Sequence, residues 1–311
     1  MSEKLVIITG ANSGIGKETA LKFARAGDTV IMACRNLEKS KKVQDEIIAA
    51  SKNDSILLMQ LDMSSFDSIK SFADEFINKF PKLDILINNA AYFNHGEDYR
   101  LTADNIEITF ATNAVGPFLL IHLLQNHLKK SDDARVLNAS SNIIKHFFSP
   151  KKEIDFNNLQ GITDSKYKHS VYTCYRNSKV AFLMLTFKMA RDFAETGIKF
   201  YSLQINGARM SKETLKKFKP GWRIIARIQN LFFPPAEFMA TNYFEICTSA
   251  KFRNETGIHL NHKLEIMKPG PEKPSIKHIR GTEYYPAYAE KETIQNKIWN
   301  FCQSATNNYM N

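Results

Sequence analysis

The sequence predicts an α/β fold, a single doubly wound domain with a mainly parallel sheet and helices on both of its faces. Short apolar runs of strand length alternate along the chain with longer stretches of helical periodicity. A glycine cluster separates the first of these runs from the first helical stretch. No internal repeat and no linker long enough to separate domains interrupts the 311 residues.

The expected elements alternate in a regular order. Apolar runs of strand length lie at residues 5–8, 29–33, 56–61, 84–87, 135–139 and 199–205, and a shorter apolar run lies at 258–260. Helical patterns lie at residues 15–25, 37–50, 66–80, 102–129, 170–195, 236–249 and 288–302. We therefore expect one domain at residues 1–262, with residues 208–240 as a substrate lid, and a C-terminal extension at 263–311 packed on the same domain.

Residues 9–16 read Thr-Gly-Ala-Asn-Ser-Gly-Ile-Gly and join the first strand to the first helix. Glycine allows the backbone to approach a pyrophosphate closely, and the free N–H groups at the positive end of the helix dipole bind its charge. A plain glycine-rich turn is the alternative interpretation. The position of the cluster between strand and helix, at the start of the chain, favours a Rossmann-type dinucleotide site.

Two charged residues follow the next two strands. Arg35 stands where an NAD-binding fold places an acid for the ribose 2′-hydroxyl. Because a planar guanidinium suits a 2′-phosphate, Arg35 favours NADP(H) over NAD(H); an exposed loop arginine without a ligand is the competing account. Asp62 follows the third strand, where its carboxylate is placed equally well to accept from an adenine amino group or to cap the next helix.

Tyr175 and Lys179 lie four residues apart in a helical pattern, so their side chains share one face of the helix. A phenol with a pKa near ~10 is a poor proton-transfer group at neutral pH. An ammonium one turn away favours the phenolate and lowers the phenol pKa toward neutrality. The pair predicts an acid/base site, whereas a half-buried ring beside a solvated cation is the plain structural interpretation.

Further polar residues occupy positions that matter in such a fold. Ser140 and Ser141 close the fifth strand, at the sheet edge where ligands bind in open α/β proteins. Asn113 lies inside a helical pattern, shortly before Gly116-Pro117 disturbs it. The ordinary role of an asparagine at such a place is a hydrogen bond to nearby backbone.

Composition limits the class of protein. With 43% hydrophobic and 24% charged residues, the chain has the composition of a folded globular protein. We expect no signal peptide and no apolar stretch near the ~18 residues that span a bilayer. The four cysteines have no paired spacing, which indicates reduced thiols. His259 and His262 have no partner carboxylate nearby, so no metal site is expected.

The formal net charge is +10, but the basic residues are scattered in small groups and form no arm with interleaved aromatic residues. Nucleic-acid binding is therefore not expected. Residues 215–239 differ from the rest, because basic and aromatic residues are mixed there between proline breaks. This pattern fits a lid over an apolar pocket, and peripheral contact with a membrane surface in addition.

The alternating elements, the glycine turn and the Tyr-x-x-x-Lys pair together resemble the short-chain dehydrogenase/reductase family, from residue 5 to about residue 260. Within that family the chain is most similar to the retinol dehydrogenase type. This judgement rests on residues 9–16, on Ala-Cys-Arg-Asn at 33–36, and on the long gap between Ser141 and Tyr175. The combination predicts a Rossmann-type fold and a nicotinamide cofactor.

Two positions depart from the family pattern. Asn206 precedes Gly207 where a proline is usual, so the loop that contacts the nicotinamide amide loses a rigid residue. Ala91 stands where glycine is usual, which crowds the cofactor if that residue needs an unusual backbone angle.

The resemblance implies a role for each site residue. Tyr175 is the acid/base, and Lys179 lowers its pKa and holds the nicotinamide ribose. Ser141, in preference to Ser140, binds the substrate oxygen. Asn113 holds a water that links Lys179 to solvent. The implied cofactor-binding residues are Gly10, Ser13, Gly14, Ile15, Gly16, Arg35, Asp62, Asn89, Tyr175 and Lys179.

The implied function is that of an NADP(H)-dependent oxidoreductase of lipid metabolism, which interconverts a hydrophobic alcohol and its aldehyde or ketone. Retinoids, steroids and lipid-like carbonyls fit this class. The alternative is a catalytically silent NADP(H)-binding regulatory or interaction protein of the same fold. We expect a cytoplasmic location with peripheral association with an intracellular membrane, and pairing through helices, as in family members, allows a homodimer.

Overall fold

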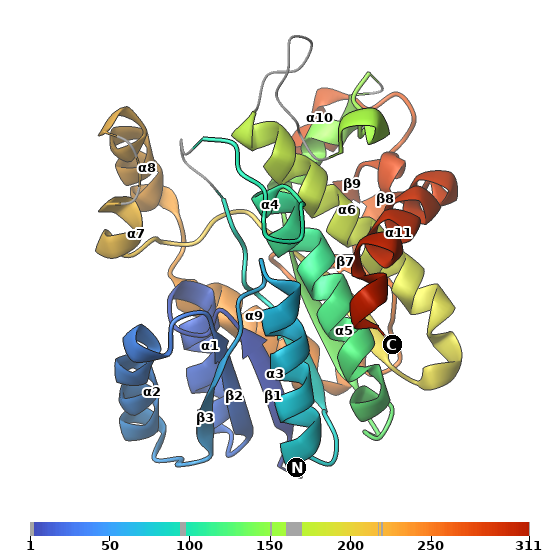
Figure 1. The fold of residues 1–311 in the computed structure, drawn as a ribbon. Helices are drawn as coiled ribbons and strands as arrows, with labels where there is room; N and C mark the ends of the chain where they lie inside the picture. Colours follow the sequence, from blue (N-terminus) through green and yellow to red (C-terminus); the bar gives the residue numbers. More distant parts are fainter. Residues whose placement is uncertain are drawn as a thin grey trace.

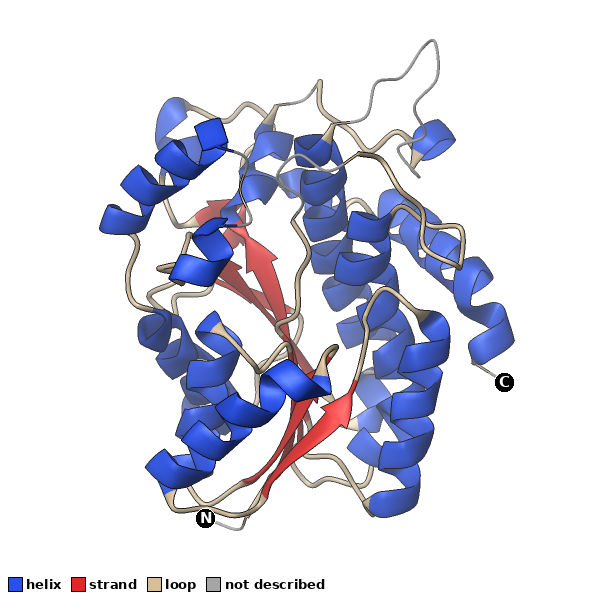
Figure 2. Cartoon of the chain, turned by 60° about the vertical axis from the view of Figure 1, so that its left-hand side comes forward, coloured by secondary structure: helices blue, strands red, loops and turns tan. Residues whose placement is uncertain are grey.

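A seven-stranded sheet forms the centre of the computed structural model, which describes residues 3–93, 98–149, 151–159, 170–216, 218 and 220–310. The strands are β1 (Leu5–Thr9), β2 (Thr29–Cys34), β3 (Ile56–Gln60), β4 (Ile85–Asn88), β5 (Arg135–Ser141), β6 (Lys199–Ile205) and β7 (Ile258–Leu260). Their order is β3-β2-β1-β4-β5-β6-β7, and each neighbouring pair is parallel. Helices flank the sheet on both sides (Figure 1, Figure 2). The predicted doubly wound α/β class is confirmed.

The sequence of β1 shows why the sheet needs cover on both faces. Leu5 and Ile7 belong to one buried apolar cluster, whereas Val6 and Ile8 belong to another. Successive strand side chains point to opposite faces, so a strand that is apolar at every position has to be buried on both sides. The continuous apolar run of β1 is the local reason for the layered arrangement.

Two sets of helices cover the two faces. The helices that pack with the Val6 cluster are α1 (Gly14–Arg25), α2 (Leu37–Ser51) and α9 (Ala236–Thr248). The helices that pack with the Ile7 cluster are α3 (Phe66–Lys79), α5 (Gly116–Leu128) and α6 (Val171–Asp192). Asn36, Ser65 and Ser170 accept backbone N–H groups at the starts of α2, α3 and α6. These short polar residues fix where the helices begin.

The helical stretch that carries Asn113 is interrupted. Helix α4 (Ile108–Phe110) continues into a π-helical segment, η1 (Ala111–Val115), and then into α5. Such π-helical turns often lie at functional sites. The stretch Ile108–Leu128 is long and apolar enough to cross a membrane, which corrects the expectation that the chain holds no such stretch. Since 78% of its apolar window is buried, it is a core helix of this fold.

The residues after β7 fold back onto the same core. Helix α11 (Glu292–Thr306) places Trp299 against Phe118 and His122, with ring centroids 5.0 Å and 5.3 Å apart. Strands β8 (Lys268–Pro269) and β9 (Tyr284–Tyr285) form a separate two-stranded sheet, and α10 (Ile276–Arg280) lies between them in sequence. The sequence patterns did not predict these three elements, because two to five residues are too few to show a period.

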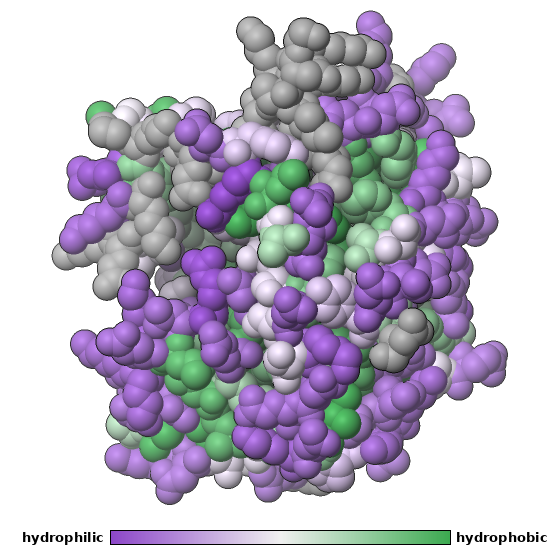
Figure 3. Space-filling model, in the orientation of Figure 1, coloured by the Kyte–Doolittle hydropathy of each residue, from purple (hydrophilic) through white to green (hydrophobic). Residues whose placement is uncertain are grey.

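Short 3₁₀ helices complete the described part of the chain. They are η2 (Asn142–Phe148), η3 (Phe156–Asn158), η4 (Ala194–Thr196), η5 (Ala250–Phe252), η6 (Ala287–Glu290) and η7 (Asn307–Tyr309). Hydrophilic residues cover most of the lower part of the molecule in Figure 3, where α2 and α3 lie.

The predicted lid at residues 208–240 forms two short helices before α9. They are α7 (Lys212–Lys216) and α8 (Pro220–Phe232). Both lie at the upper left of Figure 1, at the opposite end of the molecule from the N-terminus at which β1 begins. Residues 217 and 219 of this segment, and residues 160–169 of the long gap before Tyr175, lie outside the described residues. The assignment of a lid stays a prediction.

His259, on β7, makes the stability of this fold dependent on pH. Its Nδ1 lies 3.0 Å from Ser202 Oγ, and burial lowers its pKa to about 3. The unfolded chain therefore binds a proton below pH ~6.5 that the folded chain does not bind, so stability falls as the pH falls below that value. Between pH 6.5 and 5 we expect this group to remove about 2 kcal/mol from the free energy of unfolding.

Urea unfolding of the wild type and of His259→Gln at the two pH values measures this loss. The variant should lose less stability than the wild type on acidification. His278→Gln, on the short helix α10, is the matched control and should keep the pH dependence of the wild type. Equal pH dependence in all three proteins would contradict the assignment.

Candidate active site

Tyr175 and Lys179 lie one turn apart on α6, as the spacing predicts. Tyr175 is half-buried and Lys179 is buried. The Lys179 Nζ lies 5.8 Å from the centroid of the Tyr175 ring and donates a hydrogen bond of 2.9 Å to the carbonyl oxygen of Ala139. Since Ala139 belongs to β5, this bond ties the helix of the tyrosine to the carboxyl end of the central sheet.

Ser141 is the serine that meets Tyr175. Its hydroxyl is hydrogen-bonded to the Tyr175 phenol, and its Oγ also accepts the N–H of Ile143 at 3.3 Å. Ser140 is buried with no hydrogen-bond partner for its hydroxyl among the described residues. Neighbouring residues on a strand point to opposite faces, so only one of the two serines can face α6.

Burial controls the protonation of both groups. It raises the pKa of Tyr175, against a smaller lowering by the hydrogen bond from Ser141. It lowers the pKa of Lys179 to about 8. Burial is the larger of the two causes for Tyr175, and Lys179 is not one of them. The lowering of the phenol pKa by Lys179 stays a prediction. At neutral pH the phenol holds its proton and the ammonium is mostly charged.

Asn113, in the π-helical segment, connects the site to the loop after β4. Its Nδ2 donates to the carbonyl oxygen of Tyr92 at 2.9 Å, and its Oδ1 accepts the N–H of Tyr92 at 2.7 Å. The same Nδ2 donates to Ser178 Oγ at 3.1 Å, on the residue just before Lys179. The side chain thus makes the backbone bonds that are ordinary for a helix asparagine, and it fixes the Tyr92 loop to α6.

A row of aromatic rings extends from the tyrosine toward α8. Phe93 lies 4.6 Å from Tyr175 and 5.5 Å from Tyr172, measured between ring centroids. Tyr172 lies 6.0 Å from Trp222 of α8. The motifs did not reveal this row, although Tyr172 stands three residues before Tyr175 on the same helix. That spacing was the available signal for a shared face.

The glycine turn leaves no room for side chains where β1 meets α1. Gly10 and Gly14 have positive φ angles of 67° and 54°, a region that glycine adopts without steric cost. A Cβ on Gly16 would lie 2.4 Å from the Gly10 carbonyl oxygen and 2.6 Å from Asn89 Nδ2. Asn89 itself donates to the Thr9 carbonyl oxygen at 2.9 Å, so it holds the turn against the end of β4.

The other predicted cofactor residues lie around this turn. Ser13 is the exposed N-cap of α1, and its side chain makes no capping hydrogen bond. Ile15 is half-buried in the first turn of α1. Arg35 is exposed after β2, and no hydrogen bond or ion pair of its side chain is found in the described parts of the chain. The Asp62 Oδ1 accepts the N–H and the hydroxyl of Ser64, whereas Ser65 caps α3, so Asp62 does not have the helix-capping role that was one of its two interpretations.

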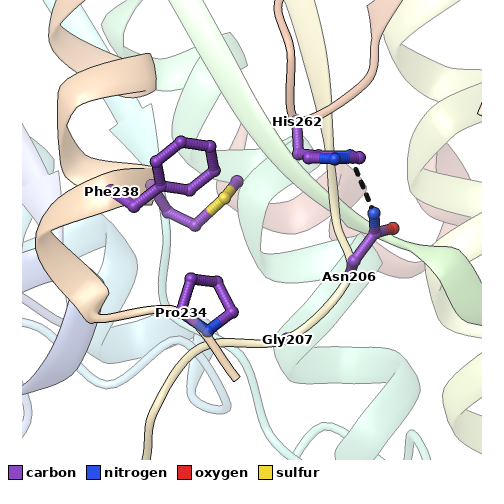
Figure 4. Close-up of a pocket in the computed structure, with 6 residues that line it drawn as sticks. Asn206, Gly207, Pro234, Phe238 and His262 are labelled. Carbon is purple, nitrogen blue, oxygen red and sulfur yellow. Dashed lines mark hydrogen bonds between the residues drawn. The ribbon is translucent and has the colours of Figure 1, made fainter. Parts of the chain in front are cut away.

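The loop after β6 contains Asn206, one of the two departures from the family pattern, and a cavity lies beside it. The Asn206 Nδ2 lies 2.9 Å from His262 Nδ1, and its Oδ1 accepts from Gln204 Nε2 at 3.0 Å. A cavity of about 320 Å³ lies beside this pair, with Pro234 and Phe238 on its other side (Figure 4). Two hydrogen bonds therefore fix the residue that stands in place of the usual proline.

Gly207 is fixed as well. It has a φ of 143°, and a Cβ there would lie 2.5 Å from the Phe233 ring. Ala91, by contrast, has no positive φ, so the alanine at that position carries no backbone strain. His262 belongs to no metal cluster: within the described ranges no group of three or more His, Cys, Asp or Glu is arranged around a common point.

The architecture is that of a short-chain dehydrogenase. It combines a doubly wound parallel sheet, a glycine turn after the first strand, and a Tyr-Lys-Ser cluster at the carboxyl edge of the sheet. The short chain dehydrogenase family model matches residues 4–148. Over these residues the chain is similar to the short-chain dehydrogenase/reductase family.

Several similar proteins with known names are retinol dehydrogenases. Retinol dehydrogenase 12 of Mus musculus is 41% identical over 200 residues, which are 64% of this chain and 60% of that protein. Retinol dehydrogenase 11 of Homo sapiens is 39% identical over 200 residues, which are 64% and 59% of the two chains. The match thus spans about 60% of the length of these relatives. The predicted resemblance to the retinol dehydrogenase type is confirmed.

Solved structures agree with the fold. An uncharacterised protein from Mycobacterium paratuberculosis superposes with a TM-score of 0.68 at 21% identity, over 98% of this chain and 94% of that one. A short chain dehydrogenase from Shigella flexneri, complexed with NADP, superposes with a TM-score of 0.65 at 19% identity, over 85% and 98% of the chains.

Replacing Lys179 by Met removes a buried charge. Burial lowers the pKa of this lysine from 10.5 to about 8, so its charged form costs the fold about 3 kcal/mol at pH 7, offset by about 1 kcal/mol from the bond to Ala139. We expect Lys179→Met to raise the free energy of unfolding by about 1 to 2 kcal/mol at pH 7. The gain should shrink above pH ~8, where the folded lysine loses its proton.

Urea unfolding across this pH range measures the effect. Lys188→Met, on the same helix, is the control, because the Lys188 ammonium pairs with Asp192 at 3.0 Å and its removal should bring no gain. A Lys179→Met protein that is less stable than the wild type at pH 7 would show that the ammonium stabilises the fold.

Proposed function

We propose that this protein is an NADP(H)-dependent oxidoreductase that interconverts a hydrophobic alcohol and its aldehyde or ketone. One observation carries the proposal: the Ser141 hydroxyl, the Tyr175 phenol and the Lys179 ammonium converge at the carboxyl end of β5. This edge is where open α/β sheets bind their ligands. The family and the relatives support the reaction class.

Each side chain has a proposed task. Ser141 hydrogen-bonds the carbonyl oxygen of the substrate, and Tyr175 gives that oxygen a proton in reduction. The protonated state of the phenol at neutral pH, which burial favours, is the state that this direction requires. Lys179 holds the nicotinamide ribose and attracts the phenolate that forms. The nicotinamide group, when bound, supplies or accepts the hydride.

Asn113 has two proposed tasks. As a positioning residue it holds Ser178, and with it the turn of α6 that carries Lys179. The water between Lys179 and solvent that the family resemblance assigns to Asn113 stays a prediction.

The proposed cofactor site consists of the glycine turn, Arg35 and the residues around them. Gly16 has no side chain to hold the first turn of α1 away from the Gly10 carbonyl oxygen and Asn89. The free N–H groups at the start of α1 therefore lie close to the strand ends, where they suit a pyrophosphate. Arg35 offers an exposed guanidinium to a 2′-phosphate, which supports NADP(H) over NAD(H). The Shigella flexneri structure, complexed with NADP, agrees with this choice. Asp62 and Asn89 are proposed as further contacts.

The proposed substrate is apolar. The row of Phe93, Tyr172 and Trp222 offers aromatic surface next to Tyr175, and the retinol dehydrogenases are named for an apolar alcohol. Retinoids, steroids and lipid carbonyls fit such a surface. We propose residues 208–240 as the lid over it. A cytoplasmic location, a homodimer and peripheral membrane contact through residues 215–239 complete the proposal.

The proposed function predicts the effect of removing the proton donor. Purified protein mixed with NADPH and a panel of apolar aldehydes and ketones should consume NADPH, which is followed by its absorbance. Tyr175→Phe removes the proton donor and should lower kcat by roughly 10²- to 10⁴-fold. Tyr309→Phe removes a phenol that bonds Asp67 on the surface and should leave the rate unchanged.

Binding separates the two candidate functions. If the protein binds NADPH, shown by a rise in melting temperature, but no carbonyl in the panel is reduced, the silent cofactor-binding protein is favoured instead. A Tyr175→Phe protein with full activity would refute the catalytic assignment.

The second prediction concerns the choice of cofactor. Arg35→Asp removes the guanidinium and places a negative charge against a 2′-phosphate. We expect the ratio of kcat/KM for NADPH to that for NADH to fall by about 10²-fold or more. Arg25→Asp makes the same change of charge at the end of α1 and should leave the ratio unchanged. An unchanged ratio in Arg35→Asp would rule out this arginine as the basis of the preference.

A further inference from the structure

Helix α8 packs onto the protein through its small and polar side. Ala226 is buried. The Asn230 side chain bonds both the N–H and the carbonyl oxygen of Met210, and the Arg223 guanidinium donates to the carbonyl oxygens of Lys216 and Phe218. A helix that packs on a protein core usually buries its large apolar residues. In α8 the side that faces the protein is held mainly by hydrogen bonds.

The large apolar residues of α8 point to solvent instead. Leu231 is 76% exposed and Phe232 is 83% exposed. The exposed apolar residues of this helix are Trp222, Ile224, Ile225, Ile228, Leu231 and Phe232. At 100° per residue they occupy one half of the helix circumference, and Ala226 and Asn230 occupy the other half. We call these six residues the outer face of α8.

Such a face requires a partner. Contiguous exposed apolar surface of this kind marks sites of protein or membrane contact in natural proteins. Scattered apolar residues elsewhere, such as Ile276 on α10, need no partner. The outer face gathers six of the chain's exposed large apolar residues within eleven positions.

The charge around α8 indicates which partner fits. Residues 207–235 contain seven basic residues and one acidic residue, in a chain whose formal net charge is +10. Among the described side chains, Arg209, Lys216 and Arg227 are exposed. Helices that lie in the surface of an anionic bilayer have this composition: an apolar face, with exposed lysine and arginine beside it.

A second copy of this chain fits less well. In a two-fold dimer the same surface meets itself, so the excess of basic residues around α8 would face an equal excess of positive charge. An anionic lipid surface supplies the opposite charge and the apolar phase together.

We propose that the outer face of α8 inserts into the surface of an anionic lipid bilayer and docks the protein there. The helix lies in the plane of the interface, with Ile228 and Phe232 in the acyl region and Arg227 at the headgroups. The hydrogen-bonded side of α8 stays on the protein.

This docking also gives the proposed substrate a path, a step that rests on the proposed function. Trp222 belongs to the outer face and also lies 6.0 Å from Tyr172, which continues through Phe93 to Tyr175. Aromatic surface therefore leads from the docked helix to the acid/base residue. An apolar alcohol or carbonyl dissolved in the bilayer reaches the site along this row without crossing water.

Vesicle binding tests the docking without any need for turnover. The chain has two tryptophans, Trp222 on the outer face and Trp299 packed between Phe118 and His122. Vesicles of phosphatidylcholine with about 30 mol% phosphatidylserine should shift the fluorescence emission of Trp222 to the blue. Brominated acyl chains should quench it. Trp222→Phe keeps Trp299 and should show neither change.

Sedimentation with the same vesicles tests the residues. Leu231→Ser with Phe232→Ser should weaken binding at least tenfold, and Ile276→Ser, an equally exposed isoleucine on α10, should leave it unchanged. Arg227→Glu should weaken binding to the anionic vesicles. Because these side chains are exposed, the melting temperatures should stay near that of the wild type, which checks the fold.

Three results would overturn the proposal. The first is equal binding of the wild type and the double serine variant to the vesicles. The second is no binding by the wild type to anionic vesicles. The third is a wild-type dimer in light scattering that the double variant dissociates, with no vesicle binding, since this would make the outer face a contact between copies. Failure of docking leaves the Tyr175→Phe assay intact, so the two proposals fail separately.

Discussion

The arrangement of the site depends on the burial of one ammonium group. Lys179 gives up most of its hydration and in return donates one hydrogen bond to the carbonyl oxygen of Ala139. That bond fixes α6 against the carboxyl end of β5. It thereby places the Tyr175 phenol within reach of the Ser141 hydroxyl, two residues beyond Ala139 on the strand. We expect an apolar residue to stabilise the helix more at this position, and we therefore propose that the lysine is there for the site.

A second constraint lies where β1, β4 and α1 meet. Because Gly16 has no side chain, the first turn of α1 can lie directly on the strand ends, against the Gly10 carbonyl oxygen and Asn89. This close approach is the geometry that brings helix N–H groups to a phosphate. Asn113 acts similarly on the other side of the sheet, because it ties the Tyr92 loop to α6. Side-chain amides, and not only glycines, therefore set the shape of both halves of the site.

The loop after β6 shows how a missing rigid residue is replaced. Proline restricts a backbone through its ring, whereas Asn206 is restricted by its two hydrogen bonds to Gln204 and His262. Burial and the neighbouring Lys263 lower the pKa of His262, which favours the neutral ring that can accept from the Asn206 amide. The departure from the family pattern therefore does not imply a loose loop.

The sequence alone determined the elements whose signal is local. Short apolar runs that alternate with helical stretches predicted the strands and the doubly wound class. The glycine spacing predicted the turn, and helical spacing predicted that Tyr175 and Lys179 share a face. The choice of Ser141 over Ser140 followed from the resemblance, and the structure shows the contact that supports it.

The tertiary structure decided what depends on neighbours distant in sequence. The direction of the Tyr175 pKa depends on burial, which no spacing rule gives. The hydrogen bond between Asn206 and His262 joins the loop after β6 to the loop after β7. The row of rings from Tyr175 to Trp222 is built from α6, the loop that holds Phe93, and α8. The sequence also did not predict the orientation of α8. An amphipathic pattern indicates that a helix has an apolar and a polar side, but not which of them faces the protein. Only packing settles that, and here the apolar side is left to the solvent.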